Sequence, residues 1–332
     1  MICELEDKIF GVQQQDFEQV ALELFQLQIK ENNLYRSFTN ALHIDPLKVK
    51  SVADVPFVPI SFFKNHEVVT GTFDPEVVFE SSGTTRTGNS KHLVKNADVY
   101  RRSFVKAFEL FYGSPEDWCI VGLLPSYLER NNSSLVMMVN DLIRLSQHKN
   151  SGFYLNEHEK LAHAIKQNEA AAQKTLLIGV TFALLDMAEM FRFPLKHTIV
   201  METGGMKGRR KEITREEVHA VLKSAWQLDA IHSEYGMTEL LSQAYSYGDG
   251  IFKCPPWMKI ILRDEDDPLT IKALSPPSVQ TGLINVIDLA NIYSCTFIAT
   301  DDIGRINPDD TFEVVGRMDS SDVRGCSLMY ES

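Results

Sequence analysis

One segment of the chain is dense in side chains that can hold phosphate. It runs from Ser81 to His92 and reads Ser-Ser-Gly-Thr-Thr-Arg-Thr-Gly-Asn-Ser-Lys-His. Glycines let backbone N–H groups turn inward, hydroxyls add donors, and the lysine adds a mobile positive charge, which together suit a polyphosphate. A flexible Ser/Thr-rich surface loop is the alternative. Gly83 and Gly88 have the spacing of the nucleotide-triphosphatase loop, but Asn-Ser follows where that motif requires Lys and then Ser/Thr, so we reject it.

Two later segments also carry reactive residue types. Ser233 to Glu239 reads Ser-Glu-Tyr-Gly-Met-Thr-Glu and follows a predicted strand. At the carboxyl end of a strand, an aromatic ring can lie against a base, a threonine hydroxyl can reach a phosphate, and a carboxylate can hold Mg²⁺. The start of a helix would explain the same residues. Thr300 to Arg305 (Thr-Asp-Asp-Ile-Gly-Arg) and Gly316 to Cys326 are equally compatible with acidic hairpin turns.

Regular alternation of helical and extended patterns surrounds these segments. Residues 15–40 have apolar side chains at helical spacing, residues 55–60 form a Pro-rich extended link, and residues 77–80 read as a short buried strand. Strands that alternate with helices imply a parallel sheet covered by helices on both faces, an α/β fold. The predicted helices cover about 98–111, 134–146, 157–172, 182–190 and 215–226, and the predicted strands cover 119–124, 176–179, 198–202 and 230–233.

The sequence pattern changes near residue 257, from alternating helices and strands to mostly strands. Predicted strands at 258–262, 281–287 and 311–315 are separated by Asp/Pro/Gly turns. We therefore expect a helix-rich start and α/β core over residues 1–256, and a smaller β-rich lobe over 257–332 that ends in a short tail.

Composition excludes several classes of protein. The chain has 33 basic and 45 acidic residues, a formal net charge of −12, which argues against nucleic-acid binding over a broad face. No stretch is apolar enough for a membrane span, and the acidic start lacks the features of a secretion signal, so we expect a cytoplasmic protein. The five cysteines are odd in number and contain no C-x-x-C pair, so we expect reduced thiols and no structural zinc.

In their order, these segments resemble the adenylate-forming superfamily of acyl-CoA synthetases and peptide-synthetase adenylation domains. That family has a Ser/Thr-rich loop ending in Lys, then Tyr-Gly-x-Thr-Glu, then Thr-Gly-Asp-x-Gly-Arg, then Gly-Arg-x-Asp near an Arg-Gly. The resemblance implies the fold of the family's large domain, and ATP and Mg²⁺ as cofactors. It assigns catalysis to Lys91, Thr238 and Glu239, and it assigns the metal to Glu239. It assigns ATP binding to Ser81, Ser82, Gly83, Thr84, Thr85, Thr87, Lys91, Gly204, Gly205, Tyr235, Gly236, Asp302 and Arg317.

More finely, Lys91 and the loop would hold the phosphates, Tyr235 would flank the adenine, and Thr238 would touch the α-phosphate. Asp302 would take the ribose hydroxyls, with Arg317 nearby. Gly204-Gly205 resembles the family's glycine segment beside the acyl and adenine pockets, although an ordinary tight turn would look alike.

The end of the sequence resembles one branch of the family, the acyl-protein synthetases of the LuxE type. The family's C-terminal lid domain would begin near Gly325, and the chain has seven residues after it, so we expect the lid to be absent. LuxE-type enzymes are acylated on a cysteine near their own C-terminus, and Cys326 is the matching candidate. A cysteine that merely lies in a tail is the alternative.

Taken together, the resemblance implies a ligase that activates a carboxylic acid, expected to be a fatty acid, as an acyl-adenylate and transfers it to a thiol, with Cys326 as the candidate acceptor. The acyl group would then pass to a reductase or transferase partner. Two alternatives stay open: an adenylating ligase that passes the acyl group to coenzyme A or a carrier protein, and a nucleotide- or acyl-binding protein without turnover.

Overall fold

The computed structural model describes residues 2–81, 88–124, 132–204, 213–274 and 277–318. The described residues fall into two compact units. The central unit is drawn from Asp74–Pro255, and the terminal unit from Met1–Phe73 together with Pro256–Ser332. The predicted division has a boundary at nearly the same place, after residue 256, but it assigned the first 73 residues to the α/β core.

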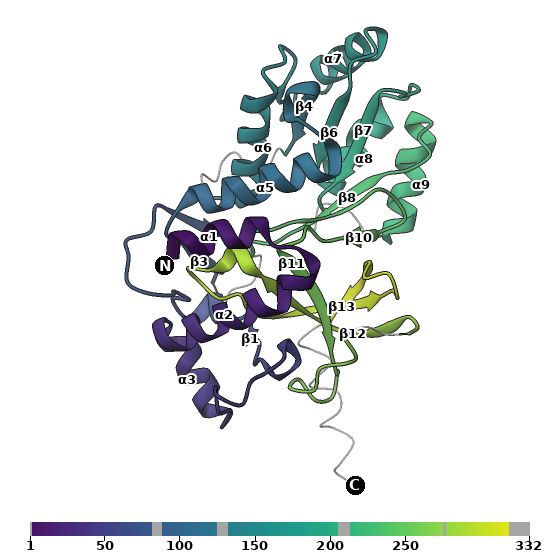
Figure 1. Ribbon diagram of the computed structural model, residues 1–332. Helices are drawn as coiled ribbons and strands as arrows, with labels where there is room; N and C mark the ends of the chain where they lie inside the picture. The colour runs from purple at the N-terminus through teal and green to yellow at the C-terminus, as the bar shows by residue number, and fades with distance from the viewer. Residues whose placement is uncertain (1, 82–87, 125–131, 205–212, 275–276, 319–332) are drawn as a thin grey trace. The chain divides into compact units, whose positions relative to one another are not determined.

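A mostly parallel sheet forms the middle of the central unit (Figure 1). Its strand order is β10-β9-β8-β7-β6-β4-β5. The neighbours from β5 to β8 are parallel, and β9 and β10 continue the sheet antiparallel. The strands are β4 (Cys119–Leu123), β5 (Gly152–Phe153), β6 (Thr175–Gly179), β7 (Thr198–Glu202), β8 (His232–Tyr235), β9 (Ala244–Ser246) and β10 (Ile251–Lys253). All residues of β4 and β6 are buried, as expected for strands covered on both faces.

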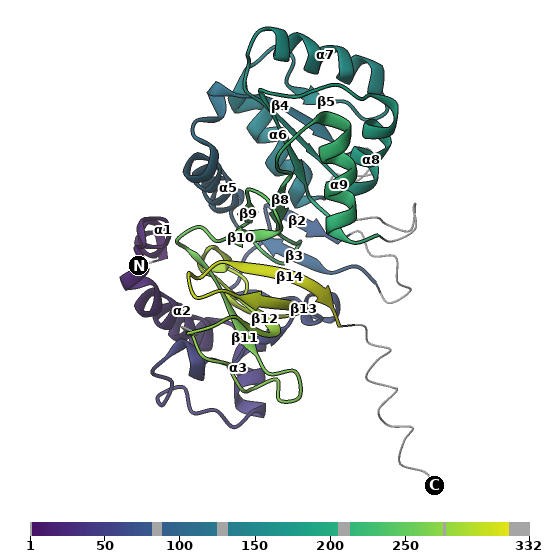
Figure 2. The same ribbon diagram turned by 90° about the vertical axis from the view of Figure 1, so that its right-hand side faces the viewer.

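Helices cover both faces of this sheet. Figure 2 shows α5 and α6 on one face and α8 and α9 on the other. The chain leaves β4 toward the edge strand β5 and then returns across the sheet through β6, β7 and β8, so right-handed crossovers place helices on opposite faces. The direction reverses at β4 and β6, and in such sheets ligands bind outside the carboxyl ends of the strands there. The helices are α5 (Ala97–Tyr112), α6 (Ser134–Ser146), α7 (His158–Ala170), α8 (Thr181–Met190) and α9 (Arg215–Trp226).

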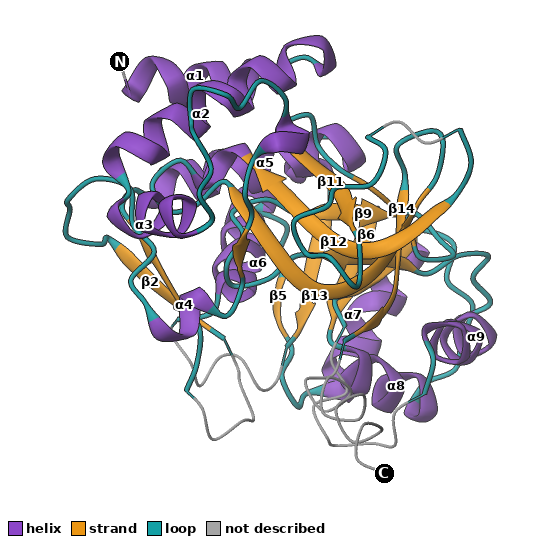
Figure 3. Cartoon of the chain, turned by 90° about the horizontal axis from the view of Figure 1, so that it is seen from below, coloured by secondary structure: helices purple, strands orange, loops and turns teal. Residues whose placement is uncertain are grey.

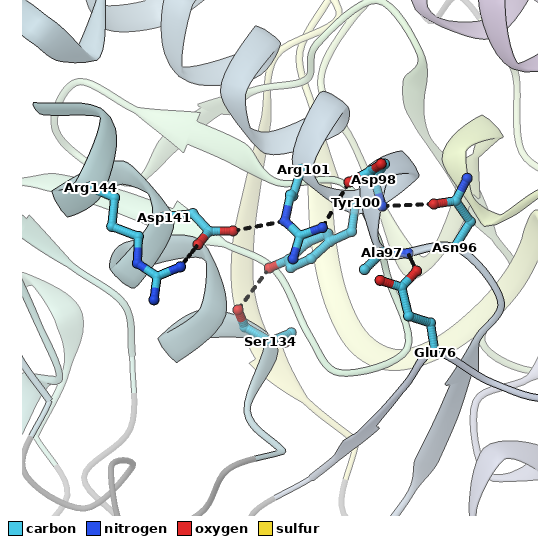
Figure 4. Close-up of polar contacts among 9 residues, drawn as sticks. All are labelled: Glu76, Asn96, Ala97, Asp98, Tyr100, Arg101, Ser134, Asp141 and Arg144. Atoms are coloured by element: carbon cyan, nitrogen blue, oxygen red, sulfur yellow. Dashed lines mark hydrogen bonds and ion pairs between the residues drawn. The ribbon is translucent and has the colours of Figure 1, made fainter.

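A separate hairpin carries the Ser/Thr-rich segment. It consists of β2 (Val77–Glu80) and β3 (Lys91–Val94), which pair antiparallel with Glu80 opposite Lys91. The chain then enters α5, where the side chain of Asn96 accepts the N–H of Asp98, and Glu76 accepts the N–H of Ala97 at 2.8 Å (Figure 4). These caps connect the hairpin firmly to α5.

Polar contacts also join α5 to α6. The buried Tyr100 hydroxyl donates to the carbonyl oxygen of Ser134 at 3.0 Å, and Arg101 lies between Asp98 and Asp141, with N···O distances of 2.7 and 3.1 Å (Figure 4). The N–H of Glu80 donates to the carbonyl oxygen of Asn132 at 2.9 Å, which ties the hairpin to the residues just before α6.

The terminal unit contains an antiparallel sheet in the order β11-β12-β13-β14, with β1 parallel to β13. Figure 3 shows α1, α2 and α3 as neighbouring helices. The predicted helix over 15–40 is interrupted at Asn32, whose side chain caps α3 and donates to the carbonyl oxygen of Ser294 at 2.9 Å. The elements are α1 (Ile2–Gly11), α2 (Phe17–Glu31), α3 (Asn33–Ala41), β1 (Val58–Pro59), α4 (Phe62–Asn65), β11 (Met258–Arg263), β12 (Gln280–Asp288), β13 (Phe297–Ile306) and β14 (Phe312–Arg317), and 3₁₀ turns cover Gln14–Asp16, Val52–Asp54, Pro115–Asp117 and Leu289–Asn291.

Two local interpretations are wrong in the structure. The segment Thr300 to Arg305 is not a hairpin turn, because it lies inside the ten-residue strand β13 and pairs with β12 and β14. The residues after Tyr235 form a turn and continue into β9, so Thr238 and Glu239 do not start a helix. In β13, pairing with the neighbouring strands outweighs the local turn preference of Asp and Gly, whereas Thr238 and Glu239 stay in a turn between two strands.

Candidate active site

The ends of the β2–β3 hairpin approach one another through the predicted phosphate segment. The N–H of Ser81 donates to the carbonyl oxygen of Ser90 at 3.0 Å, and the N–H of Ser90 donates to the Ser81 hydroxyl at 2.9 Å. Gly88 has φ +88°, which favours glycine. Lys91 starts β3 with an exposed side chain whose Nζ lies 3.9 Å from Glu80 Oε1. Ser82, Gly83, Thr84, Thr85 and Thr87 lie outside the described residues.

His92 connects this hairpin to the second segment. It follows Lys91 on β3, so its side chain points to the opposite face, and it is 1% exposed. Its Nδ1 lies 3.0 Å from the carbonyl oxygen of Thr238, which can only accept, so Nδ1 is the protonated nitrogen. Burial lowers the pKa of His92 to about 4, although the bond to Thr238 acts in the opposite direction. A neutral imidazole therefore holds the strand of Lys91 next to Thr238.

The second segment begins inside strand β8, of which Tyr235 is the last residue. The Tyr235 ring lies 5.9 Å from that of Phe252. Gly236 packs closely against its neighbours: a Cβ there would lie 2.4 Å from Glu234 Oε1, so a larger residue would displace that side chain. The buried Glu239 follows Thr238 in a turn whose closing bond runs from the N–H of Leu240 to the carbonyl oxygen of Met237.

The glycine segment after β7 begins as a tight turn. Gly204 has φ +72° and donates its N–H to Glu202 Oε1 at 2.9 Å. Gly205 lies outside the described residues. Because β7 and β8 are neighbours, Gly204 and Tyr235 leave adjacent strands at the same edge of the sheet.

In the terminal unit, the structure brings Asp302 and Arg317 together. They are paired residues on β13 and β14, with 3.9 Å between Arg317 Nε and Asp302 Oδ1. A second contact of 3.8 Å joins Arg317 to Asp301. The buried Arg263 donates to the carbonyl oxygen of Thr300 at 2.5 Å, and the Thr300 hydroxyl accepts the N–H of Asp302 at 3.2 Å. A buried guanidinium thus supports the strand that presents Asp302.

Sequence reasoning missed four residues that support these segments: His92, Glu202, Glu234 and Arg263. A signal existed for Glu202, a charged residue that ends an apolar strand and is separated by only Thr203 from two glycines. Glu234 stands between Ser233 and Tyr235, and burial together with the charge of Glu202 raises its pKa to about 8. Perturbed acids of this kind cluster at functional sites.

The sequence predicts that Glu239, a buried carboxylate that follows Thr238, holds a magnesium ion that arrives with a nucleotide. Mg²⁺ prefers oxygen ligands and is usually bound by one or two carboxylates plus substrate phosphates. Among the residues that the structure describes, no three His, Cys, Asp or Glu side chains come close enough to form an all-protein metal cage. Such a shared site needs one protein carboxylate, which is the role that the sequence analysis predicts for Glu239.

A search of the helices in the described part of the chain found none with the length and apolar character that crossing a bilayer requires.

Comparisons with solved structures show the fold. The chain is 15% identical to the luciferase-like enzyme of the nonluminescent mealworm Zophobas morio, with a TM-score of 0.51 over 76% of this chain and 60% of that one. It is 15% identical to O-succinylbenzoate coenzyme A synthetase from Bacillus subtilis, solved in complex with ATP and magnesium ion, with a TM-score of 0.52 over 74% of this chain and 51% of that one. The chain thus spans about half to three fifths of the length of these structures, and the predicted α/β fold is confirmed.

Comparisons of sequence show the family. The chain is 24% identical to the long-chain-fatty-acid–luciferin-component ligase of Vibrio harveyi, over 92% of this chain and 84% of that protein. The model of the family described as acyl-protein synthetase, LuxE, matches residues 10–332. The chain therefore belongs to the LuxE family of acyl-protein synthetases, which confirms the predicted acyl-activating ligase and its reaction class.

Proposed function

We propose that this chain activates a fatty acid with MgATP and passes the acyl group to a cysteine thiol, with Cys326 as the acceptor. In the first step a carboxylate oxygen attacks the α-phosphorus of ATP. The bond between the α-phosphorus and the bridging oxygen breaks, and acyl-adenylate and pyrophosphate form. Such a step needs positioning and charge stabilisation more than covalent help from the protein.

The chain's own residues would supply that positioning. Lys91 and the hydroxyls and N–H groups of Ser81–Thr87 hold the phosphates, Thr238 contacts the α-phosphate, and Tyr235 lies against the adenine. The glycines at 204 and 205 border the adenine and acyl groups, and the Asp302–Arg317 pair takes the ribose. A magnesium ion held by Glu239 supplies positive charge to the phosphate oxygens when it is bound.

In the second step a cysteine thiolate attacks the acyl carbonyl carbon. The bond to the phosphate oxygen breaks, AMP leaves, a thioester forms, and the thiol proton passes to solvent. Burial raises the pKa of Cys119, and it raises the pKa of Cys295 to about 12, so these two thiols are poor nucleophiles. This supports an acceptor elsewhere in the chain. Cys326, which lies outside the described residues, has the position that the family uses, and a reductase or transferase would take the acyl group from it.

The observation that carries the proposal is the bond between His92 and the carbonyl oxygen of Thr238. It places the strand that starts with Lys91 against the turn that contains Thr238 and Glu239. Two segments whose bonded residues are 146 positions apart in the sequence are thereby neighbours, as one phosphate site requires.

Pyrophosphate exchange tests the proposal. Fatty acids of increasing length are incubated with ATP, Mg²⁺ and labelled pyrophosphate, and label entering ATP is measured. We expect exchange that depends on the acid. It should fall about 100-fold in Lys91→Ala, because the substitution removes one positive charge that stabilises the phosphates. Lys253→Ala, which removes an exposed lysine from β10, is the matched control.

The alternatives give other results. Acyl label that appears only on added coenzyme A or carrier protein would identify a ligase with an external acceptor. Binding of ATP without exchange across the whole acid series would identify a binding protein, and full exchange in Lys91→Ala would refute the phosphate assignment.

A further inference from the structure

A buried carboxylate lies at the carboxyl edge of the parallel sheet, beside the predicted site. Glu202 is the last residue of β7 and is 7% exposed. A buried charge is costly unless other groups compensate it, so the contacts of Glu202 indicate what it does.

Those contacts come from four different parts of the central unit. Oε1 accepts the hydroxyl of Thr181, at the start of α8, at 2.8 Å, and the N–H of Gly204 at 2.9 Å. Oε2 lies 3.4 Å from the hydroxyl of Ser233 on β8 and 3.6 Å from Nε2 of His219 on α9. One carboxylate thus joins the ends of β7 and β8 to the two helices on the same face.

His219 makes this arrangement unusual for a simple core contact. Its side chain is 6% exposed, and its Nε2 has no hydrogen-bond partner among the described residues. The nitrogen faces Glu202 Oε2, 3.6 Å away. Burial alone would raise the pKa of Glu202, but the contacts with His219 and Thr181 and the charge of Arg215 hold it below its usual value.

Gly204 donates its N–H to this carboxylate from an unusual backbone conformation. Its φ of +72° is a conformation that other residues rarely adopt, and a Cβ built on it meets no atom of the described residues within 4 Å. No described side chain fills the space beside this backbone, as expected where a ligand comes close to it. Gly204 makes two hydrogen bonds to described residues. Its N–H donates to Glu202, and its carbonyl oxygen accepts the N–H of Thr181 at 3.4 Å.

We propose that Glu202, paired with His219, is a positioning residue for the activation step: it fixes the Gly204 turn against β8, and so sets how tightly the nucleotide and acyl group bind. The inference rests on the proposed function, because the glycine segment borders the adenine and acyl groups only if the acyl-adenylate forms there.

A matched control exists at the other end of the same strand. Glu169 accepts the N–H groups of Lys196 and His197 at 2.8 and 3.0 Å, and the hydroxyl of Thr198 at 2.6 Å. It makes the same kinds of contact at the amino end of β7, far from the edge where ligands bind in such sheets. Loss of this carboxylate tests the structural part of the effect.

The experiment compares Glu202→Leu, Glu202→Gln and Glu169→Leu. For each, the KM for ATP and for a fatty acid is measured by pyrophosphate exchange, the Kd for ATP is measured by calorimetry, and unfolding is followed in urea. We expect Glu202→Leu to raise the KM and Kd for ATP about tenfold or more, as the loss of one charged hydrogen bond implies. Glu202→Gln, which keeps the acceptor oxygen for Gly204, restores most of the affinity. Glu169→Leu leaves both constants unchanged.

Two safeguards keep the test decisive. If Glu202→Leu does not fold, the double variant with His219→Leu replaces the whole buried pair by apolar groups, a change that proteins often tolerate; its Kd for ATP is then compared. Unchanged Kd and KM in a folded variant overturn the inference. If the wild type binds ATP but exchanges no pyrophosphate, the proposed function is refuted, and the Kd values for ATP still test the positioning role of Glu202. If the wild type does not bind ATP, both the proposed function and this inference are refuted.

Discussion

Glu234 gives the chain a measurable dependence of stability on pH. Glu234 belongs to β8, and its side chain is partly buried. Burial and the charge of the neighbouring Glu202 raise its pKa from 4.5 to about 8. The folded chain therefore binds a proton that the unfolded chain releases between these two pH values. The contribution of Glu234 to stability is complete below pH 4.5 and is lost as the pH rises through about 8.

The size of the effect follows from the two pKa values. Each tenfold change in proton affinity corresponds to about 1.4 kcal/mol, so the full difference is roughly 5 kcal/mol. Solvent reaches part of the side chain and screens its charge. We therefore expect the free energy of unfolding to change by about 2 kcal/mol over this pH range. Glu234→Gln keeps the shape and removes the titration. The variant should gain stability relative to the wild type as the pH rises from 5 to 8.5.

Urea unfolding at closely spaced pH values measures this difference. Two histidines, His92 and His232, have pKa values lowered to about 4 by burial, and they cost stability as the pH falls below 6.5. Both histidines are present in the wild type and in the variant. Their contributions therefore cancel when the free energy of unfolding of one protein is subtracted from that of the other. Glu159→Gln, which changes an exposed residue of α7, is the control and should give a constant difference. A constant difference for Glu234→Gln as well would refute the assignment of a raised pKa.

Three further outcomes are expected. His92→Leu removes the donor to the Thr238 carbonyl and should lower pyrophosphate exchange about tenfold, whereas His92→Asn, which can donate from a similar position, should keep most of it; equal loss in both would mean that the bond does not matter. Gly236→Ala places a methyl group 2.4 Å from Glu234 Oε1 and should cost about 1–3 kcal/mol in urea unfolding, a loss that the added change Glu234→Ala should relieve. Cys326→Ser should leave exchange intact and abolish the thiol-labile acyl mass; persistence of that mass would point to another acceptor.

Most of the central unit could be predicted because its pattern is local. Helical spacing and apolar runs give α5 to α9 and the strands β4, β6, β7 and β8 to within a few residues, whereas the two-residue edge strand β5 was missed. β13 could not be predicted, because Asp301, Asp302 and Gly304 read as turn formers, and the strands that pair with them lie elsewhere in the sequence.

The supporting residues of the site escaped prediction for the same reason. His92 and Thr238 are 146 positions apart, and no local pattern indicates that one bonds to the other. Lys91, by contrast, is visible from sequence, because the phosphate segment leads directly to it. Residues that would touch the ligand form short motifs, whereas residues that hold those motifs in place are found through the fold.

The terminal unit is assembled from both ends of the polypeptide, and this has a consequence for biosynthesis. Val58 on β1 pairs with Ile298 on β13, and the side chain of Gln28 bonds to Thr296. On the ribosome, the first 73 residues must wait for these partners while all of Asp74–Pro255 is made. During that time the nascent chain carries the apolar face of α2 without its partner strands, and transiently exposed apolar surface of this kind favours aggregation.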